Sequence, residues 1–309
     1  MKKITFNCFN DFKCKADKCK HSCCVGWEIG IDKKSLKRYK KDKSCLKERL
    51  NDCIDYKKAY FITNKEKRCP FLDKNNLCDI IKTHGEKGLC QVCSDHPRFR
   101  NFFSNRIEEG FGLSCEKAVD LLFDFEGELL EKSSDIKGKS KKLNRFEENL
   151  LNYRNSIIEI ILDSRKDFTC RIKELYNGIK SHISDINLLE VKNLFNSLER
   201  LDDGLFLSIE NLRNLTFDFN QEFSKELERL TWYFIIRHVS GSIDNLDTKS
   251  RTLFSVLSTA IIYNLLINSE EKTIEKFKDI VREYSKEIEY SEENISKILD
   301  YTDKKAVKL

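Results

Sequence analysis

The side chains best able to do chemistry in this sequence are cysteine thiols, and they are crowded into one part of it. The chain has 309 residues and 13 cysteines, twelve of which lie in the first 115 residues. In a reducing compartment, clustered thiols more often bind metals than form disulfides. The odd number of cysteines, and a length that needs no covalent staples, also favour metal binding. Disulfides and buried free thiols remain the alternatives.

Nine of the cysteines form closely spaced groups that are typical of metal sites. They are Cys14, Cys19, Cys23, Cys24, Cys69, Cys78, Cys90, Cys93 and Cys115. Two residues separate Cys90 from Cys93, a spacing that lets two sulfur atoms face one ion from a tight turn. We therefore predict these nine residues as candidate metal ligands. The metal stays open between zinc and an iron–sulfur cluster, because tetrahedral sulfur sites suit both.

The other cysteines and the nearby histidines have simpler interpretations. We expect the remaining four cysteines to be small packing residues: Cys8, Cys45, Cys53 and Cys170. Three histidines could each supply a further ligand, although a single histidine is more often a surface or loop residue: His21, His84 and His96.

The residues around the thiols resemble a known family. The run from Phe12 to Asp32, with Cys23-Cys24 followed by Val25-Gly26-Trp27, is similar to the opening of the flagellin lysine-N-methylase (FliB) family. Further short motifs then follow in the order of that family, at residues 69–72, 77–78, 85–86, 89–93, 97–98 and 113–115. The resemblance covers about the first 120 residues. The sequence departs from the family pattern at His96, where an aromatic residue is expected. His96 could be a metal ligand, a polar contact or a neutral replacement.

The resemblance implies an S-adenosylmethionine-dependent methyltransferase that acts on lysine side chains of flagellin in the cytoplasm. It also implies an iron–sulfur cluster, of the [4Fe-4S] type, held by the cysteines, with zinc as the alternative metal. For binding the methyl donor we select Trp27, which could stack on adenine, and Arg98, which could pair with a carboxylate. Trp27 could instead form a wall of the metal module, and Arg98 could instead form a structural ion pair. The sequence selects no catalytic residue, and the oligomeric state stays open.

Two other classes of function also remain open. One is an iron–sulfur redox or electron-transfer protein, and the other is a zinc-stabilised binding module without catalysis. The sequence contains neither a Gly-rich dinucleotide fingerprint nor the C-x3-C-x2-C spacing of radical enzymes. A donor site of either familiar kind therefore has no support in the sequence.

The elements that must position these residues are predicted to be mainly helical. Apolar residues recur at spacings of three and four from Phe146 to Leu162, and Asn187 followed by Glu190 marks a helix start. Helices are also predicted near 33–43, 46–60, 223–234, 253–267, 270–287 and 291–301, and strict polar–apolar alternation is not seen. We expect a mainly α protein in which an irregular, cysteine-rich metal-binding module (1–130) precedes an all-helical region (131–309). The best linker candidate is 133–142.

Charge and hydropathy limit the partners. Residues 1–125 carry 27 Lys and Arg against 18 Asp and Glu, whereas the remainder carries 29 against 33. We interpret the basic run 33–43 as a solvated helix face, because it lacks the interleaved aromatic residues that bind nucleic acid. The apolar run 253–267 is interrupted by polar residues and predicts a buried helix, not a membrane span. Without an apolar secretory segment at the N-terminus, we expect a cytoplasmic protein.

Overall fold

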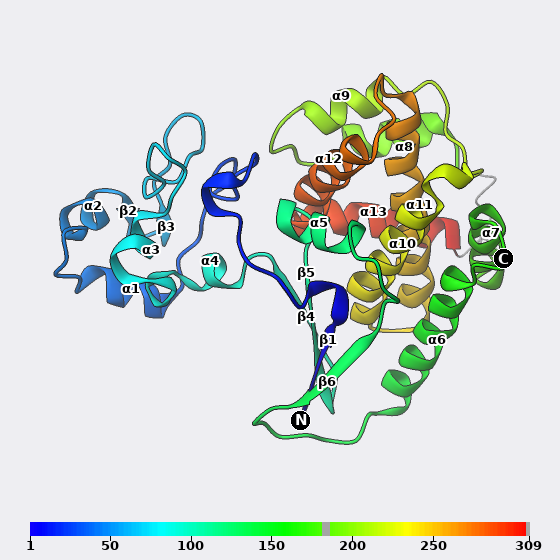
Figure 1. The fold of residues 1–309 in the computed structure, drawn as a ribbon, viewed down its shortest axis with the longest axis horizontal. Coiled ribbons are helices and arrows are strands. Elements are labelled where there is room, and N and C mark those ends of the chain that lie inside the picture. Colours follow the sequence, from blue (N-terminus) through cyan, green and yellow to red (C-terminus); the bar gives the residue numbers. More distant parts are fainter. Residues whose placement is uncertain (181–185, 307–309) are drawn as a thin grey trace.

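The first strand of the chain lies between strands that come much later in the sequence. In this computed structural model, which describes residues 1–180 and 186–306, β1 (Lys2–Phe6) pairs in parallel with β5 (Arg106–Phe111) and antiparallel with β6 (Glu131–Asp135). Strand β4 (Arg98–Phe102) forms an antiparallel hairpin with β5, so the sheet order is β4-β5-β1-β6. The chain between β1 and β4 therefore leaves the sheet and returns to it (Figure 1).

Most of that excursion folds into a small cysteine-rich lobe, which projects to one side of the molecule (Figure 1). We call residues 24–93 the lobe. Its elements are α1 (Lys33–Lys40), α2 (Lys47–Asp52), β2 (Ile54–Asp55), β3 (Tyr60–Phe61), α3 (Asp79–His84) and the start of α4 (Gln91–Asp95). They enclose a hydrophobic core of their own, in which Phe61 packs edge-on against Phe71. The lobe thus has a core separate from that of the rest of the chain.

Helices make up most of the remaining structure, which we call the body. In chain order they are α5 (Glu116–Phe123), α6 (Arg145–Leu162), α7 (Phe168–Gly178), α8 (Leu188–Asn196), α9 (Gly204–Glu210), α10 (Ser224–His238), α11 (Asn245–Asn268), α12 (Ile274–Tyr284) and α13 (Glu292–Ala306). Helix α11 runs through the middle of the body and contacts α10, α12 and α13 (Figure 1). A second large hydrophobic core fills the space between these helices and the sheet.

Local signals explain where several helices begin. Helix α6 opens with a capping box, in which the Asn144 side chain accepts from the Glu147 backbone N–H and the Glu147 side chain accepts from the Asn144 backbone N–H. Asn187 caps α8 by accepting from the Glu190 N–H at 3.0 Å, as predicted. Helix α11 is long and apolar enough to cross a membrane, but 89% of its most apolar window is buried inside the fold. That burial is typical of a core helix.

One buried arginine ties the sheet to the helical layer. Arg154 of α6 is completely buried and contacts Glu108 of β5 at 2.5 Å, Glu131 of β6 at 3.0 Å and Ser240 at 2.7 Å. These contacts match the charge of the buried guanidinium and its two terminal nitrogens, whereas Nε has no hydrogen-bond partner among the described residues.

The structure confirms a mainly α protein and corrects several finer expectations. The four-stranded sheet was not predicted, and 133–135 of the expected linker belong to its edge strand β6. The predicted helix at 46–60 ends at Asp52 and gives way to the β2–β3 hairpin. Of the cysteines interpreted as packing residues, Cys8 is buried, but Cys45 and Cys170 are exposed, so the interpretation is wrong for those two. The boundary at residue 130 stays a prediction about domains.

Candidate functional site

Five of the nine predicted ligands pack in or against the lobe core. We call Cys24, Cys69, Cys78, Cys90 and Cys93 the lobe thiols. The Cys69 backbone N–H donates to the Cys24 carbonyl at 2.8 Å, which brings the first and second cysteine motifs together. Cys90 and Cys93 share a thiol–thiol hydrogen bond, and Cys69 interacts electrostatically with Cys24, Cys78 and Cys90.

The other four predicted ligands gather where the lobe meets the body. We call Cys14, Cys19, Cys23 and Cys115 the junction thiols. Cys14 and Cys19 flank a short 3-10 turn (Ala16–Lys18), and Cys115 precedes the first residue of α5. Cys23 interacts electrostatically with Cys14 and Cys115, and Cys19 interacts with Cys115. The adjacent residues Cys23 and Cys24 share a thiol–thiol hydrogen bond, which joins the two groups.

The thiols are grouped without converging on a single point. Within residues 1–180 and 186–306, no three His, Cys, Asp or Glu side chains lie close enough together to hold a metal ion as they stand. Metal binding would therefore require rotations of the cysteine side chains. The metal-binding module predicted from the sequence stays a prediction, whereas the gathering of its candidate ligands is a feature of the fold.

Neighbouring thiols lower the pKa of two of the lobe thiols, which favours the thiolate, the form that binds metals. A hydrogen bond from Cys23 lowers the pKa of the Cys24 thiol to about 7, with Ser22 and Arg68 assisting against the opposite effect of burial. The hydrogen bond from Cys93 likewise lowers the pKa of Cys90. Burial instead raises the pKa of Cys69 to about 12. A soft cation would oppose that effect of burial and favour the thiolate form.

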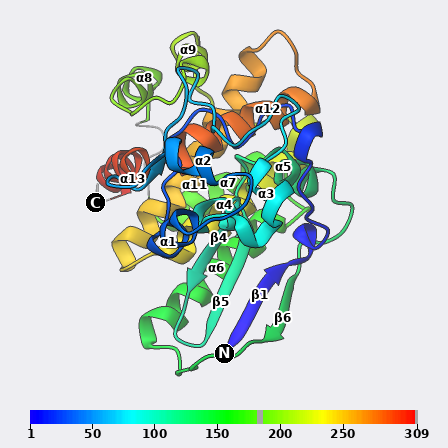
Figure 2. The ribbon, with the colours of Figure 1, turned by 90° about the vertical axis from the view of Figure 1, so that its left-hand side faces the viewer.

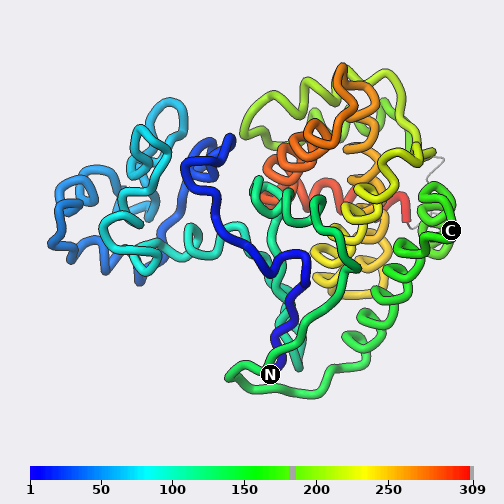
Figure 3. The backbone as a smooth tube through the Cα atoms, in the orientation of Figure 1, coloured from blue at the N-terminus to red at the C-terminus, as the bar shows by residue number. Residues whose placement is uncertain are grey.

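A charged helix face lies opposite the cysteine loop. The Lys286 Nζ lies 3.5 Å from the position that a Cβ on Gly26 would occupy, and His21 interacts electrostatically with Arg282 and Asp279. Residues 279, 282, 283 and 286 fall on one face at helical spacing. Figures 2 and 3 show the N-terminal loop running past α12 and α5. This face was not predicted from the sequence, because its four residues lie among many other charged residues of the same segment.

Two glutamates of this segment have unusual acidity. Burial, with the Asp202 charge adding to it, raises the pKa of Glu283, and the same two causes raise the pKa of Glu287. Lys286 pairs with Asp202 at 2.6 Å and with Glu287 at 3.7 Å. A carboxylate whose pKa is raised is a better proton acceptor near neutral pH, and an acidic site also attracts an ammonium group.

Beneath this face lies a buried hydrogen-bond network on the π-helical turn η7 (Ser285–Glu289). His238 Nε2 contacts Glu289 at 2.6 Å, and the Tyr233 hydroxyl donates to Glu289 at 2.9 Å. Arg237 donates to the Tyr233 hydroxyl at 2.7 Å and pairs with Glu289 at 3.2 Å. Burial raises the pKa of Glu289, but the Arg237 charge and the His238 hydrogen bond outweigh it and hold the pKa below its usual value. The network fixes the segment that faces the thiols.

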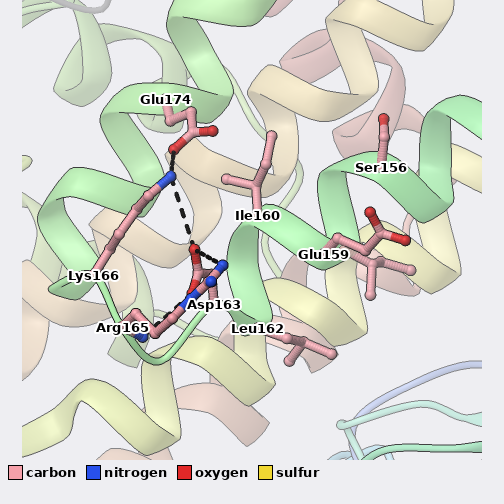
Figure 4. A pocket seen from close by; sticks show the side chains of 9 residues that line it. Ser156, Glu159, Ile160, Leu162, Asp163, Arg165, Lys166 and Glu174 are labelled. Atoms are coloured by element: carbon pink, nitrogen blue, oxygen red, sulfur yellow. Dashed lines mark hydrogen bonds and ion pairs between the residues drawn. The ribbon is translucent and has the colours of Figure 1, made fainter.

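A surface hollow between α6 and α7 is the other concave region of note. Figure 4 shows its lining residues, among which Lys166 pairs with Glu174 at 2.5 Å and Arg165 pairs with Asp163 at 2.7 Å. These charges satisfy one another, and α7 lies on the side of the body away from the lobe (Figure 1). The hollow is therefore a poor candidate for the functional site.

Curated Salmonella proteins are similar to this chain. Over 267 residues, or 80% of the chain, it is 27% identical to the lysine-N-methylases of Salmonella typhimurium and Salmonella choleraesuis, and it spans 65% of the length of each. Over 121 residues, or 37% of the chain, it is 30% identical to the flagellar biosynthetic protein FliU of Salmonella muenchen, of which it covers 72%. The chain belongs to the family of FliU. No family model and no solved structure match the sequence.

The two residues selected for donor binding in this FliU-like chain have structural contacts. The Trp27 ring packs against the lobe core, and its Nε1 donates to the Cys23 carbonyl at 2.8 Å. Arg98 donates to the Ser94 carbonyl at 3.2 Å, and its guanidinium lies over the rings of Phe111 and Phe12. Trp27 thus forms part of the wall of the lobe, and Arg98 is held by aromatic faces. Their role in donor binding stays a prediction.

His96, the departure from the family pattern, lies at the same junction. Its Nε2 is buried without a hydrogen-bond partner among the described residues, and its ring lies 5.7 Å from that of Tyr290. Burial, with a smaller contribution from Arg237, lowers the pKa of His96 to about 4, so the imidazole is neutral at pH 7. Of the three interpretations of His96, its packing against Tyr290 favours the neutral replacement of an aromatic residue over a ligand or a polar contact.

Proposed function

We propose that this chain is a protein-lysine N-methyltransferase that transfers methyl groups from S-adenosylmethionine to lysine side chains of flagellin in the cytoplasm. The observation that carries the proposal is the similarity to lysine-N-methylases over 80% of the chain. The flagellar name of FliU supports flagellin as the substrate.

The junction offers the chemistry that this reaction needs. A lysine ammonium, with a pKa near 10.4, must lose a proton before its nitrogen can attack. The lone pair then forms a bond to the methyl carbon as the sulfur–methyl bond breaks, and S-adenosylhomocysteine departs with the electron pair. We assign Glu283 as the proton acceptor, because its pKa is raised and its helix face lies opposite the cysteine loop. Trp27 and Arg98 are the proposed contacts of the donor.

The chemistry of the lobe thiols fits the iron–sulfur cluster that the resemblance implies. Four thiolates are needed for a [4Fe-4S] cluster, and five cysteines line the lobe core. When bound, such a cluster supplies an electron-accepting centre and a rigid anchor for short helices. The chain itself provides acidic thiols at Cys24 and Cys90 and excludes water from Cys69.

The test is methylation of purified flagellin by the full chain, purified without oxygen, with a donor labelled in its methyl group. We expect labelled lysines, located by peptide mass spectrometry. Glu283→Gln should lower the rate by about 100-fold or more, the usual contribution of a general base. Glu275→Gln, an exposed carboxylate on the same helix, is the matched control and should keep the rate.

Other outcomes separate the remaining functions. The absence of any labelled lysine with metal-loaded protein would overturn the methyltransferase. A reversible colour change on reduction without methyl transfer would identify a redox protein instead. Stoichiometric zinc, with no iron and no donor binding, would identify a zinc-stabilised binding module.

A further inference from the structure

One lysine side chain lies between the charged face of α12 and the cysteine loop. Lys286 Nζ pairs with Asp202 at 2.6 Å, and it lies 3.5 Å from the position that a Cβ on Gly26 would occupy. Gly26 directly precedes Trp27, the proposed contact of the methyl donor. The ammonium group of Lys286 is therefore within contact range of the loop that carries this proposed contact.

Three carboxylates lie near this ammonium group. Asp202 and Glu287 pair with it at 2.6 and 3.7 Å, and Glu283, three residues earlier, interacts with it electrostatically. Glu287 is fully buried, and its Oε2 accepts from the Leu201 backbone N–H at 2.8 Å. The other oxygen, Oε1, lies 3.7 Å from Lys286 Nζ and has no hydrogen bond within the part of the chain that the structure describes. A buried carboxylate oxygen without a donor suits a site that receives an ammonium group.

The proposed reaction requires the same surroundings for its acceptor. The acceptor nitrogen must lie near Glu283, the assigned proton acceptor, and near the donor bound at Trp27. Lys286 interacts with the first and lies against the residue before the second. Because the Asp202 side chain is 48% exposed, water screens its ion pair, which can open to release the ammonium. An acceptor within the same chain then reacts at a high effective concentration.

A second lysine of α12 provides a comparison of similar pairing and burial. Lys278 Nζ pairs with Asp124 at 2.6 Å, the same distance as in the pair of Lys286 with Asp202. Its side chain is 15% exposed, compared with 26% for Lys286. Its partners belong to α5 and to the residue that ends α5, and not to the loop that carries Asp202. Lys278 is therefore an internal control for reactivity that depends on the position of Lys286.

We propose that Lys286 is a methylation site of this chain and accepts a methyl group from S-adenosylmethionine when flagellin is absent. The proposal rests on the proposed function, because the donor and the proton acceptor are those assigned there. The ammonium proton passes to the Glu283 carboxylate, and the Nζ lone pair forms a bond to the methyl carbon. The sulfur–methyl bond breaks, and its electron pair stays with S-adenosylhomocysteine. The methylated ammonium keeps its charge and can still pair with Asp202.

Incubation of the full chain, purified without oxygen, with a donor labelled in its methyl group tests this proposal. No flagellin is added, and each lysine is followed by peptide mass spectrometry. Lys286 should carry the label, whereas Lys278 should react about ten-fold or more slowly. Because the transfer occurs within one chain, the fraction labelled per minute should not change with protein concentration. A fraction that rises with concentration, or a label on Lys276 with none on Lys286, would overturn the proposal.

Variants and a parallel reaction with flagellin separate this proposal from the proposed function. Glu283→Gln should lower the rate of labelling at Lys286 by about 100-fold or more, and an unchanged rate would overturn the proposed proton transfer. Lys286→Arg keeps a cation beside Asp202 but should lose the label on the chain, whereas Lys278→Arg should keep it. Labelled flagellin with unlabelled Lys286 would overturn this proposal alone. The absence of label on both proteins would overturn the proposed function as well.

Discussion

Replacement of His96 by phenylalanine should remove part of the acid sensitivity of the fold. The folded pKa of about 4 lies below the value of about 6.5 of an unfolded histidine, so the unfolded chain binds the proton more readily between these values. Stability from keeping this ring neutral is therefore fully present above pH 6.5 and is lost as the pH falls towards 4.

The size of the effect follows from the same two values. One pKa unit corresponds to about 1.36 kcal/mol, and lowering the pH from 7.5 to 5.0 should cost the wild type about 2 kcal/mol through this group alone. His96→Phe supplies the aromatic ring expected at this position and has no proton to gain. We expect its stability to fall by about 2 kcal/mol less over this pH range.

Urea unfolding at pH 7.5 and pH 5.0 measures this difference, with both proteins at the same metal content. The two tryptophans report on different parts, since Trp27 packs against the lobe core and Trp232 lies in the body against Phe6. Other titrating groups act in both proteins and cancel in the comparison. Equal losses of stability in the wild type and His96→Phe would refute the reasoning.

Three further predictions concern the thiols, the buried arginine and the junction. Cys90→Ala should lose the lobe metal and the activity, whereas Cys45→Ala, at an exposed position, should keep both. Elemental analysis measures the metal, and the far-UV helicity of Cys90→Ala should survive because the body has its own core. Arg154→Leu should lower the free energy of unfolding by about 3–5 kcal/mol, because the buried Glu108 would lose its shorter ion pair and keep only Arg106 at 3.1 Å. The exposed Arg165→Leu should change it by less than about 1 kcal/mol, and an unchanged urea midpoint in Arg154→Leu would contradict the prediction. Gly112→Ala should destabilise by about 1–3 kcal/mol, because its Cβ would lie 2.4 Å from the Tyr290 hydroxyl and 2.6 Å from Arg237 Nη1, and thermal melts that match the wild type would show that the junction can expand.

The sequence predicted the parts of the fold that have local causes. The helices α6, α8 and α11 follow from apolar spacing, the cap at Asn187 and a long buried run. No local sequence pattern predicts the sheet. Strand β6 is polar and exposed along its whole length, and it is a strand only because it pairs with β1. Glu108 likewise gave no sign of its complete burial, which depends on Arg154 from a distant helix.

The candidate site was predictable in its residue types and not in its arrangement. Closely spaced cysteines identify the ligand candidates. The sequence does not show that Cys23 belongs to the junction thiols and Cys24 to the lobe thiols, because this depends on which core each segment joins. Glu283 and Lys286 could not be selected, because they lie among many charged residues of α12 and η7. Only the fold sets this helix face against Gly26.

The pairing of β1 with strands made much later has a consequence for synthesis on the ribosome. The core of the lobe lies between Ile29 and Cys90, so it can be completed while β5 and β6 have not yet been translated. Until then β1 has no partner, and its edge is open to pairing with other nascent chains. A lobe that acquires its metal early would emerge as the first stable unit, and the sheet would close around its two ends only after residue 135 has left the ribosome. The availability of metal during translation would then influence how much of the protein folds without aggregating.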